Sequence, residues 1–382
     1  MASGVRIMTL YSILSLAGLA ILFVPFVHHA AEARARYYSI YLLLSSFLIA
    51  AAVMPALISL GHRIGLVDSP NEKRKTHERA TPLTGGIGIY IAFVAIMLLS
   101  FHFSVEVKVI LVASTVIFLV GLADDIWGIS AFFRLLVQVA AALLLVVYGI
   151  HVTFVPAFLG GIITETIITM VWIIGITNSM NFIDGMDGLA SGSSIIYTLF
   201  FSLIAILTKQ YYLMFLALAI TGSCAGFLPY NFRKGKPALV FLGDSGSTFL
   251  GFLLASFAIL GEWGKSIIDI VIPVLIMSVL IFDMTLTTVV RILTGEVKTF
   301  GQWLHYTGRD HFHHRLADLG ITNHQATLLL FGVSIAFGIE ALGISFASVL
   351  VSVLILLHSI LVFTIIGIIL VLKKNKKPAD VL

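Results

Sequence analysis

The stretch VKVILVASTVIFLVGLADD, residues 107–125, decides the class of fold, because a long apolar run ends abruptly in two acids. As a helix, the run over 107–123 is long enough to cross a hydrocarbon core about 30 Å thick. An unpaired carboxylate at membrane depth costs on the order of 3 kcal/mol. We therefore expect Asp124 and Asp125 to stand at a helix end facing a short polar loop, with a role that justifies their position.

Comparable apolar runs recur from one end of the chain to the other. Hydrophobic residues make up 59% of the 382 residues and charged residues only 11%, against about 25% in soluble domains. The sequence therefore predicts an all-α, polytopic helical membrane protein of about 11–12 transmembrane helices, forming a single domain over residues 1–382. The predicted spans are residues 7–27, 39–61, 83–101, 107–123, 133–150, 166–180, 190–208, 211–229, 246–262, 267–290, 327–344 and 346–371.

The basic residues are divided unequally between the two faces that these spans define. The face with the N-terminus, the even-numbered loops and the C-terminal tail carries 18 of the 23 Lys and Arg residues. By the positive-inside rule that face is cytoplasmic. The long polar loops fall on the same face, at residues 62–82, 124–132, 178–189, 230–245 and 291–326. The sequence thus places its long polar loops, together with the acids at their ends, at the cytoplasmic face.

The adjacent acids Asp124 and Asp125 cannot point the same way on a helix. We expect one to face a site while a neighbouring base holds the other, since paired carboxylates raise each other's pKa or demand a cation. A helix end that merely faces water is the alternative. Arg134, at the start of the next span, either binds phosphate through its planar guanidinium group or only anchors the helix at the interface.

The segment NSMNFIDGMDG, residues 178–188, gathers the most oxygen-bearing side chains. Asn178, Asn181 and Asp184 recur every three residues, which places them near one helical face, and Asp187 follows. Hard oxygen donors of this kind suit Mg²⁺ or Mn²⁺ rather than zinc. The alternative is an ordinary Asn/Asp/Gly-rich turn.

Two further segments carry candidate ligands. In FLGDSGS, residues 241–247, Asp244 stands at a predicted helix N-terminus, either as a metal ligand or as a simple N-cap. Phe241 either stacks on a base or packs in the core. In HFHH, residues 311–314, histidines lie among arginines and form a reasonable diphosphate clamp. A basic loop against anionic lipid headgroups is the alternative there.

The basic run at residues 73–79 precedes TPLTGG, residues 81–86. The proline and the paired glycines mark a shaped helix entry, where we expect the backbone to approach a ligand closely.

Together these segments resemble the polyprenyl-phosphate N-acetylhexosamine-1-phosphate transferases, a family of polytopic membrane enzymes. Five stretches match in the family's order, over residues 60–325 or so: GLVDSPNEKRKTHERATPLTGG (65–86), LADD (122–125), NSMNFIDGMDGLASG (178–192), VFLGDSGSTFLGF (240–252) and HFHHRLADLGIT (311–322). The GLVDSPN opening, the PLTGG sequence and the His-x-His-His form look like the branch that uses UDP-N-acetylglucosamine. The similar peptidoglycan-precursor translocase branch typically reads TPTMGG.

The resemblance implies transfer of a sugar 1-phosphate from UDP-N-acetylglucosamine to undecaprenyl phosphate, with release of UMP, in a bacterial cytoplasmic membrane. The product would start a surface glycan such as O antigen or wall teichoic acid. Transfer of phospho-N-acetylmuramoyl-pentapeptide is the alternative within the family. An ion- or metabolite-coupled transporter is the alternative outside it, although transporters more often place polar groups near the bilayer midplane. We expect no nucleic-acid partner, and both a monomer and a homodimer stay open.

The resemblance also implies roles for single residues. Asp244 and Asn181 would hold Mg²⁺, or Mn²⁺ in its place, on the donor diphosphate. Asp124 or Asp125 would orient or deprotonate the acceptor phosphate, and Asp184 would support the metal or nucleotide pocket. The implied substrate-binding set is Asn178, Asp187 at the uracil, Phe241 stacked on it, Arg134 at a phosphate, and Arg309, His311, His313 and His314 at the diphosphate and sugar. The branch often carries an acid where this chain has Gly128, so no role for that acid carries over.

Overall fold

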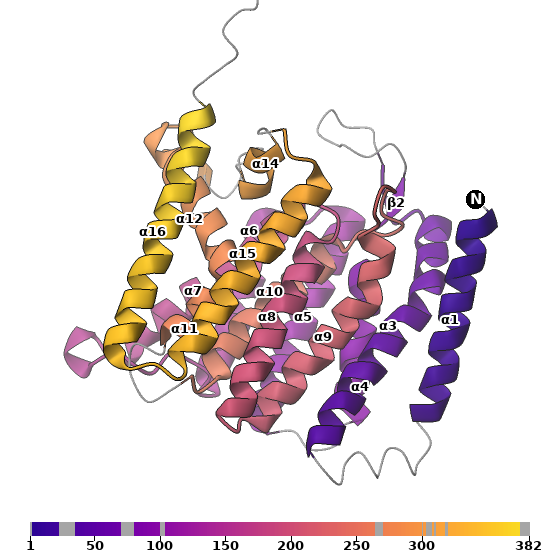
Figure 1. Ribbon diagram of the computed structural model, residues 1–382, viewed down its shortest axis with the longest axis horizontal. Coiled ribbons are helices and arrows are strands. Elements are labelled where there is room, and N and C mark those ends of the chain that lie inside the picture. The colour runs from indigo at the N-terminus through magenta and orange to yellow at the C-terminus, as the bar shows by residue number, and fades with distance from the viewer. Residues whose placement is uncertain are drawn as a thin grey trace, which may run out of the picture. The chain divides into compact units, whose positions relative to one another are not determined.

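The computed structural model describes residues 2–22, 35–69, 80–99, 104–263, 270–299, 301–302, 308, 311–317 and 320–374. Within these ranges the chain is a set of helices accompanied by one two-stranded ribbon (Figure 1). The predicted fold class, an all-α polytopic membrane protein, is confirmed.

The chain divides into two compact units, Met1–Glu262 and Trp263–Leu382. The first unit contains α1 (Ala2–Leu22), α3 (Ala35–Ile64), β1 (Val67–Asp68), β2 (Thr81–Pro82), α4 (Gly85–Leu99), α5 (Val105–Trp127), α6 (Ala131–Val147), the 3₁₀ turn η1 (Ala157–Leu159), α7 (Ile162–Ile183), α8 (Leu189–Leu207), α9 (Tyr211–Asn231) and α10 (Gly243–Leu260). The second unit contains α11 (Val271–Ile276), α12 (Ser278–Leu293), α14 (Phe312–Ala317), α15 (Asn323–Ile344) and α16 (Val349–Lys374). The prediction of a single transferase domain over the whole chain stays a prediction.

The helices follow the apolar runs of the sequence closely. Among the described residues, eight helices are long and apolar enough to cross a membrane, namely α3, α5, α7, α8, α9, α10, α15 and α16. Shorter apolar helices lie in α1, α4 and α6. These helices coincide with all the predicted spans except 267–290, where the chain forms α11 and α12. Met277, at φ −99° and ψ 20°, leaves the helical region and separates the two.

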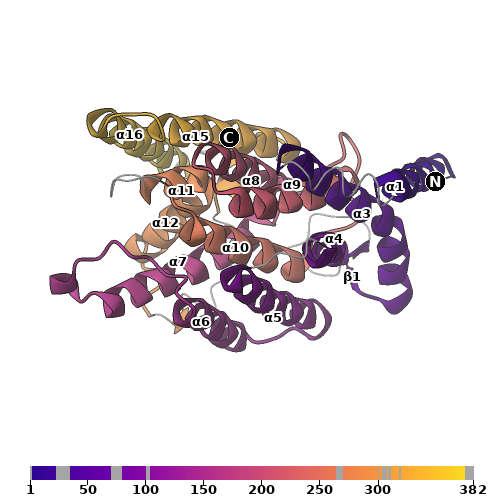
Figure 2. The ribbon, with the colours of Figure 1, turned by 90° about the horizontal axis from the view of Figure 1, so that it is seen from below.

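Helix α10 lies at the centre of the first unit and carries one of the predicted site segments. It packs against α4, α5 and α7 (Figure 2), and 15 of its 18 residues are buried. Glycines permit this close packing. A Cβ atom on Gly121 of α5 would lie 2.7 Å from the Cα of Ser245, and one on Gly251 of α10 would lie 2.8 Å from the Cα of Thr177 in α7. Helix α5 therefore packs closely against the first turn of α10, and α7 packs closely against its middle.

The segment TPLTGG supports the entry to α10 with its backbone. Strand β2 pairs antiparallel with β1, and the N–H of Phe241 donates to the carbonyl of Pro82 at 2.8 Å. In return Gly86 donates its N–H to the carbonyl of Leu242 at 2.8 Å. The expected close approach is present, but here it is to another stretch of the same backbone: a Cβ atom on Gly86 would lie 2.4 Å from the nitrogen of Gly246. The basic run at 73–79 lies outside the described residues.

Candidate functional site

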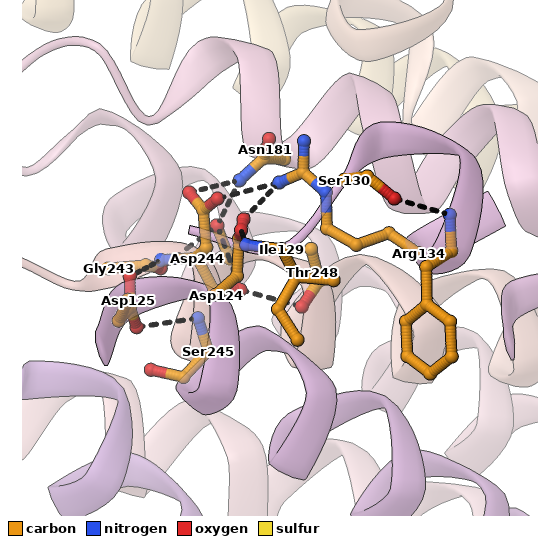
Figure 3. Close-up of polar contacts among 12 residues, drawn as sticks. Asp124, Asp125, Ile129, Ser130, Arg134, Asn181, Gly243, Asp244, Ser245 and Thr248 are labelled. Carbon is orange, nitrogen blue, oxygen red and sulfur yellow. Dashed lines mark hydrogen bonds and ion pairs between the residues drawn. The ribbon is translucent and has the colours of Figure 1, made fainter. Parts of the chain in front are cut away.

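Four helix ends of the first unit meet at one polar cluster (Figure 3). Helix α5 brings Asp124 and Asp125 at its C-terminal end, and α6 brings Arg134 in its first turn. Helix α7 brings Asn181 near its last residue, and α10 brings Asp244 in its first turn. Residues up to 120 positions apart in the sequence are thereby joined by hydrogen bonds.

Asp244 is bonded on both of its carboxylate oxygens. Oδ2 accepts from Nη1 of Arg134 at 2.8 Å, and Oδ1 accepts from Nδ2 of Asn181 at 2.9 Å. The same Nδ2 lies 2.9 Å from Oγ of Ser247, one turn along α10. Since the side chain of Asp244 bonds residues of α6 and α7, it is more than a cap of its own helix. The predicted meeting of Asn181 and Asp244 is present in the structure.

The two adjacent acids have different partners. Asp124 forms an ion pair with Nη1 of Arg134 and accepts the N–H of Ile129. Asp125 instead accepts the N–H of Asp244 on Oδ1 at 2.8 Å and the N–H of Ser245 on Oδ2 at 3.0 Å. The two acids diverge as the sequence predicts: a neighbouring base, Arg134, pairs with Asp124, while backbone amides bond Asp125. These amides are the unpaired donors at the start of α10, where a carboxylate is stabilised.

Arg134 lies between Asp124 and Asp244 and bonds both carboxylates through one nitrogen. Ser130 is the N-cap of α6, and its hydroxyl accepts the N–H of Phe133, so the guanidinium group is carried on a capped first turn. The side chain of Arg134 is 29% exposed and that of Asp244 is 38% exposed. Arg134 therefore belongs to an accessible cluster in which one cation contacts two carboxylates, rather than acting only as an interfacial anchor.

The remaining acids and amides of residues 178–188 take separate positions. Nδ2 of Asn178 donates to Oε1 of Gln138 at 2.7 Å, which ties α7 to α6 one turn beyond Arg134. Asp184 follows the last residue of α7 as its C-cap. Burial, and then the negative charge of Asp244, raise the pKa of Asp184 well above its usual value.

Asp187 contacts the loop that leads to Phe241. Oδ2 of Asp187 accepts the N–H of Ala238 at 3.3 Å. Next to it, Oδ1 of Asn231 accepts the N–H of Gly188 at 2.6 Å, while Nδ2 of Asn231 donates to the carbonyl of Val240 at 2.9 Å. The predicted uracil-binding residues thus lie on two segments that Asn231 links. The sequence analysis missed Asn231, although an amide directly after an apolar run was a usable signal.

The histidine segment belongs to the second unit. His311 is buried, with Nδ1 at 2.8 Å from Oδ2 of Asp283 in α12, and Nε2 at 3.5 Å from Nη2 of Arg291. The sequence analysis missed Asp283 and Arg291, although an acid inside the apolar run 267–290 was a visible signal. His314 lies in α14 and is partly accessible. Arg309 and the side chain of His313 lie outside the described residues. The clamp role of these residues stays a prediction.

The cluster around Asp244 offers hard oxygen donors for a cation. Within the described ranges, no three His, Cys, Asp or Glu side chains group as a metal cage. Asp124, Asp244 and Asn181 offer two carboxylates and one amide, and this set fits Mg²⁺, which usually keeps several waters and takes one or two carboxylates plus substrate phosphates. Asn181 presents its N–H groups to Asp244, so joint binding of one cation requires the amide to turn its oxygen inward.

Comparisons with known proteins agree on one group of relatives. The family model for glycosyl transferase family 4 matches residues 107–262. The chain is 32% identical to a probable undecaprenyl-phosphate N-acetylglucosaminyl 1-phosphate transferase from Bacillus subtilis, covering 84% of this chain and 89% of that protein. It is 30% identical to a decaprenyl-phosphate N-acetylglucosaminephosphotransferase from Mycolicibacterium smegmatis, covering 73% and 76%. It is 29% identical to a phospho-N-acetylmuramoyl-pentapeptide-transferase from Bacillus cytotoxicus, covering 71% and 87%.

Proposed function

The chain belongs to glycosyl transferase family 4, and we propose that it transfers N-acetylglucosamine 1-phosphate from UDP-N-acetylglucosamine to undecaprenyl phosphate. The products are N-acetylglucosaminyl-diphospho-undecaprenol and UMP, and the reaction is the first membrane step of a surface glycan pathway. The observation that carries this proposal is the cluster of Asp124, Arg134, Asn181 and Asp244 at the joined ends of apolar helices. It places charged groups able to bind phosphates beside segments long enough to span a membrane.

In the proposed reaction an oxygen of the acceptor phosphate attacks the β-phosphorus of the donor. A new P–O bond forms, the bond from the β-phosphorus to the bridging oxygen breaks, and UMP leaves with the electron pair. A phosphate monoester is already largely ionised near pH 7, because its second pKa is about 6. A strong general base is therefore unnecessary, and catalysis depends on positioning and charge neutralisation.

The residues of the cluster divide these tasks. Arg134 neutralises and orients phosphate oxygens through its guanidinium donors. Asp124, one of the two acids that bond Arg134, orients the acceptor side. Asp244 and Asn181 would hold Mg²⁺, which when bound supplies Lewis-acid charge neutralisation on the donor diphosphate. Asp187 and Phe241 bind the uracil, and the segment at 311–314 binds the sugar and diphosphate. The positive-inside distribution supports a site that opens to the cytoplasm.

The similarity to a phospho-N-acetylmuramoyl-pentapeptide-transferase supports a second candidate for the donor substrate. The similarity to the Bacillus cytotoxicus transferase covers 71% of this chain. We therefore keep UDP-N-acetylmuramoyl-pentapeptide as the competing donor. The broader and higher identity to the Bacillus subtilis relative favours UDP-N-acetylglucosamine.

A donor competition tests the proposal. The purified chain in detergent receives undecaprenyl phosphate, Mg²⁺ and both UDP donors at equal concentration, and UMP release and the lipid product are measured. We expect the lipid product to carry N-acetylglucosamine. A product that carries only the muramoyl-pentapeptide would support the second donor, and the absence of any UMP with either donor would contradict the enzyme assignment.

A further inference from the structure

Asp283 is a buried acid in α12 to which the proposed mechanism assigns no role. Its exposed fraction is 1%, and it stands in the apolar sequence LIFDMTL, residues 280–286. A buried carboxylate is costly unless it is paired and hydrogen-bonded. Its partners therefore show what it does.

Both oxygens of Asp283 bond the start of the histidine segment. Oδ2 lies 2.8 Å from Nδ1 of His311, and Oδ1 accepts the N–H of Phe312. Phe312 is the first residue of α14, whose first turn closes with the N–H of Arg315 donating to the carbonyl of His311 at 3.0 Å. One carboxylate thus anchors both the imidazole ring and the first backbone donor of this helix.

The opposite edge of the ring faces a cation. Nη2 of Arg291, which is 3% exposed, lies 3.5 Å from Nε2 of His311. A guanidinium group only donates hydrogen bonds, so the nitrogen facing it must accept. A carboxylate only accepts, so the nitrogen facing Asp283 must carry the proton. In this arrangement the ring of His311 lies between one anion and one cation and carries its proton on Nδ1.

We propose that Asp283 is a positioning residue for the transferase: it fixes the ring and tautomer of His311 and anchors α14, so that residues 311–315 keep one arrangement for the donor. This inference rests on the proposed function. Asp283 acts through His311 and does not touch the substrate. Residues that hold a functional histidine in one tautomer commonly affect activity without taking part in the chemistry.

The variant Asp283→Asn tests the anchor. An amide keeps the shape but has only one accepting oxygen, so either the His311 ring or the Phe312 N–H loses its acceptor. We expect kcat/KM for UDP-N-acetylglucosamine to fall about 10- to 100-fold, by analogy with the loss of carboxylate partners from metal-binding histidines. The matched control is Glu340→Gln, which makes the same carboxylate-to-amide change at another carboxylate–imidazole pair of this unit, where Oε1 of Glu340 lies 2.9 Å from Nδ1 of His358. We expect the control to keep kcat/KM within about 2-fold of the unmodified protein, as for a substitution away from the site.

A second pair of variants separates anchoring from direct action. His311→Asn keeps an N–H for Asp283, whereas His311→Ala removes it, so we expect the Asn variant to retain at least about 5-fold more activity. The double variant Asp283→Asn/His311→Ala should have a kcat/KM no lower than that of the less active single variant, because the two residues act as one unit. The comparison of His311→Asn with His311→Ala still tests the anchor if Asp283→Asn fails to fold.

Three outcomes would overturn the anchor: wild-type kcat/KM in Asp283→Asn, equal activity of the two His311 variants, or penalties that multiply in the double variant. Nitrogen NMR of histidine-labelled protein reads the tautomer directly, with the His311 signal assigned by its loss in His311→Ala. We expect a neutral ring protonated on Nδ1, which Asp283→Asn changes. Because this signal needs no turnover, it stands even if the unmodified chain releases no UMP, an outcome that counts against the proposed function alone.

Discussion

The carboxylate of Asp125 holds the backbone of Asp244, with Oδ1 accepting the Asp244 N–H at 2.8 Å. The other oxygen accepts the N–H of Ser245 at 3.0 Å. Asp125 therefore acts as a cap for α10 that comes from α5, a helix 120 residues earlier in the chain. Its neighbour Asp124 instead bonds Arg134 within the cluster. The two adjacent acids therefore have different roles: Asp125 fixes the first turn of α10, and Asp124 is part of the polar cluster itself.

The first prediction concerns Asp125→Asn. The amide retains one acceptor for two backbone donors, so one N–H at the start of α10 is left unsatisfied. Loss of a helix cap costs about 0.5–2 kcal/mol. We expect a lower unfolding temperature in detergent together with reduced UMP release, because the position of Asp244 is disturbed. An unfolding temperature equal to that of the unmodified protein would show that Asp125 is not needed as a cap.

The second prediction concerns Gly243, which has a φ of +77° directly before Asp244. In Gly243→Ala the new Cβ atom would lie 2.7 Å from Oδ2 of Asp125, so strain at a positive φ adds to a clash with the capping carboxylate. Gly235 is the matched control, because its φ is +68° and nothing lies within 4 Å of the added Cβ atom. We expect Gly235→Ala to cost about 1 kcal/mol of backbone strain and Gly243→Ala clearly more.

Thermal unfolding and UMP release of the two alanine variants check this difference. We expect activity to fall in Gly243→Ala and to be retained in Gly235→Ala. Equal unfolding temperatures for the two variants would mean that α10 can shift away from Asp125 without loss.

The sequence predicts the helices well because the length of an apolar run and the acids at its end are local properties. The meeting of Asn181 and Asp244 was also predictable. Each is a polar residue at the end of a predicted helix, and both helix ends lie on the predicted cytoplasmic face. The partner of Asp125 was not predictable, because backbone amides become available only when α5 and α10 pack closely through Gly121.

The same limit applies in the second unit. The link between Asp283 and His311 joins positions 28 residues apart, and it depends on where α14 begins relative to α12. The periodicity of the sequence does not predict where α14 begins relative to α12. The acid itself was visible in the run 267–290, yet its role follows only from the two groups that it bonds.

The third prediction concerns the metal. Removal of divalent cations with EDTA should abolish UMP release, and Mg²⁺ or Mn²⁺ should restore it, because the oxygen donors of Asp124, Asp244 and Asn181 suit hard cations. Potassium chloride at the same ionic strength serves as the control for general screening. Full turnover in EDTA would contradict a divalent cation at this cluster.

The fourth prediction concerns Asp244→Asn. The amide keeps an oxygen for Nδ2 of Asn181, so we expect the protein to fold with an almost unchanged unfolding temperature. It loses the negative charge that pairs with Arg134 and that would hold Mg²⁺. A metal ion supplies several kcal/mol of charge stabilisation, so we expect kcat to fall by about 100-fold or more.

The matched control for Asp244→Asn is Ser247→Ala. It removes the other group that lies 2.9 Å from Nδ2 of Asn181 and leaves every carboxylate of the cluster in place. If the charge of Asp244 matters and the local hydrogen bonds do not, Ser247→Ala keeps most of its turnover and its Mg²⁺ requirement. If both variants lose activity equally, the orientation of Asn181 is the common cause and the assignment of Asp244 as a metal ligand fails. Titration of Mg²⁺ against UMP release in both variants distinguishes these results, because only loss of a ligand raises the Mg²⁺ concentration needed for half-maximal activity.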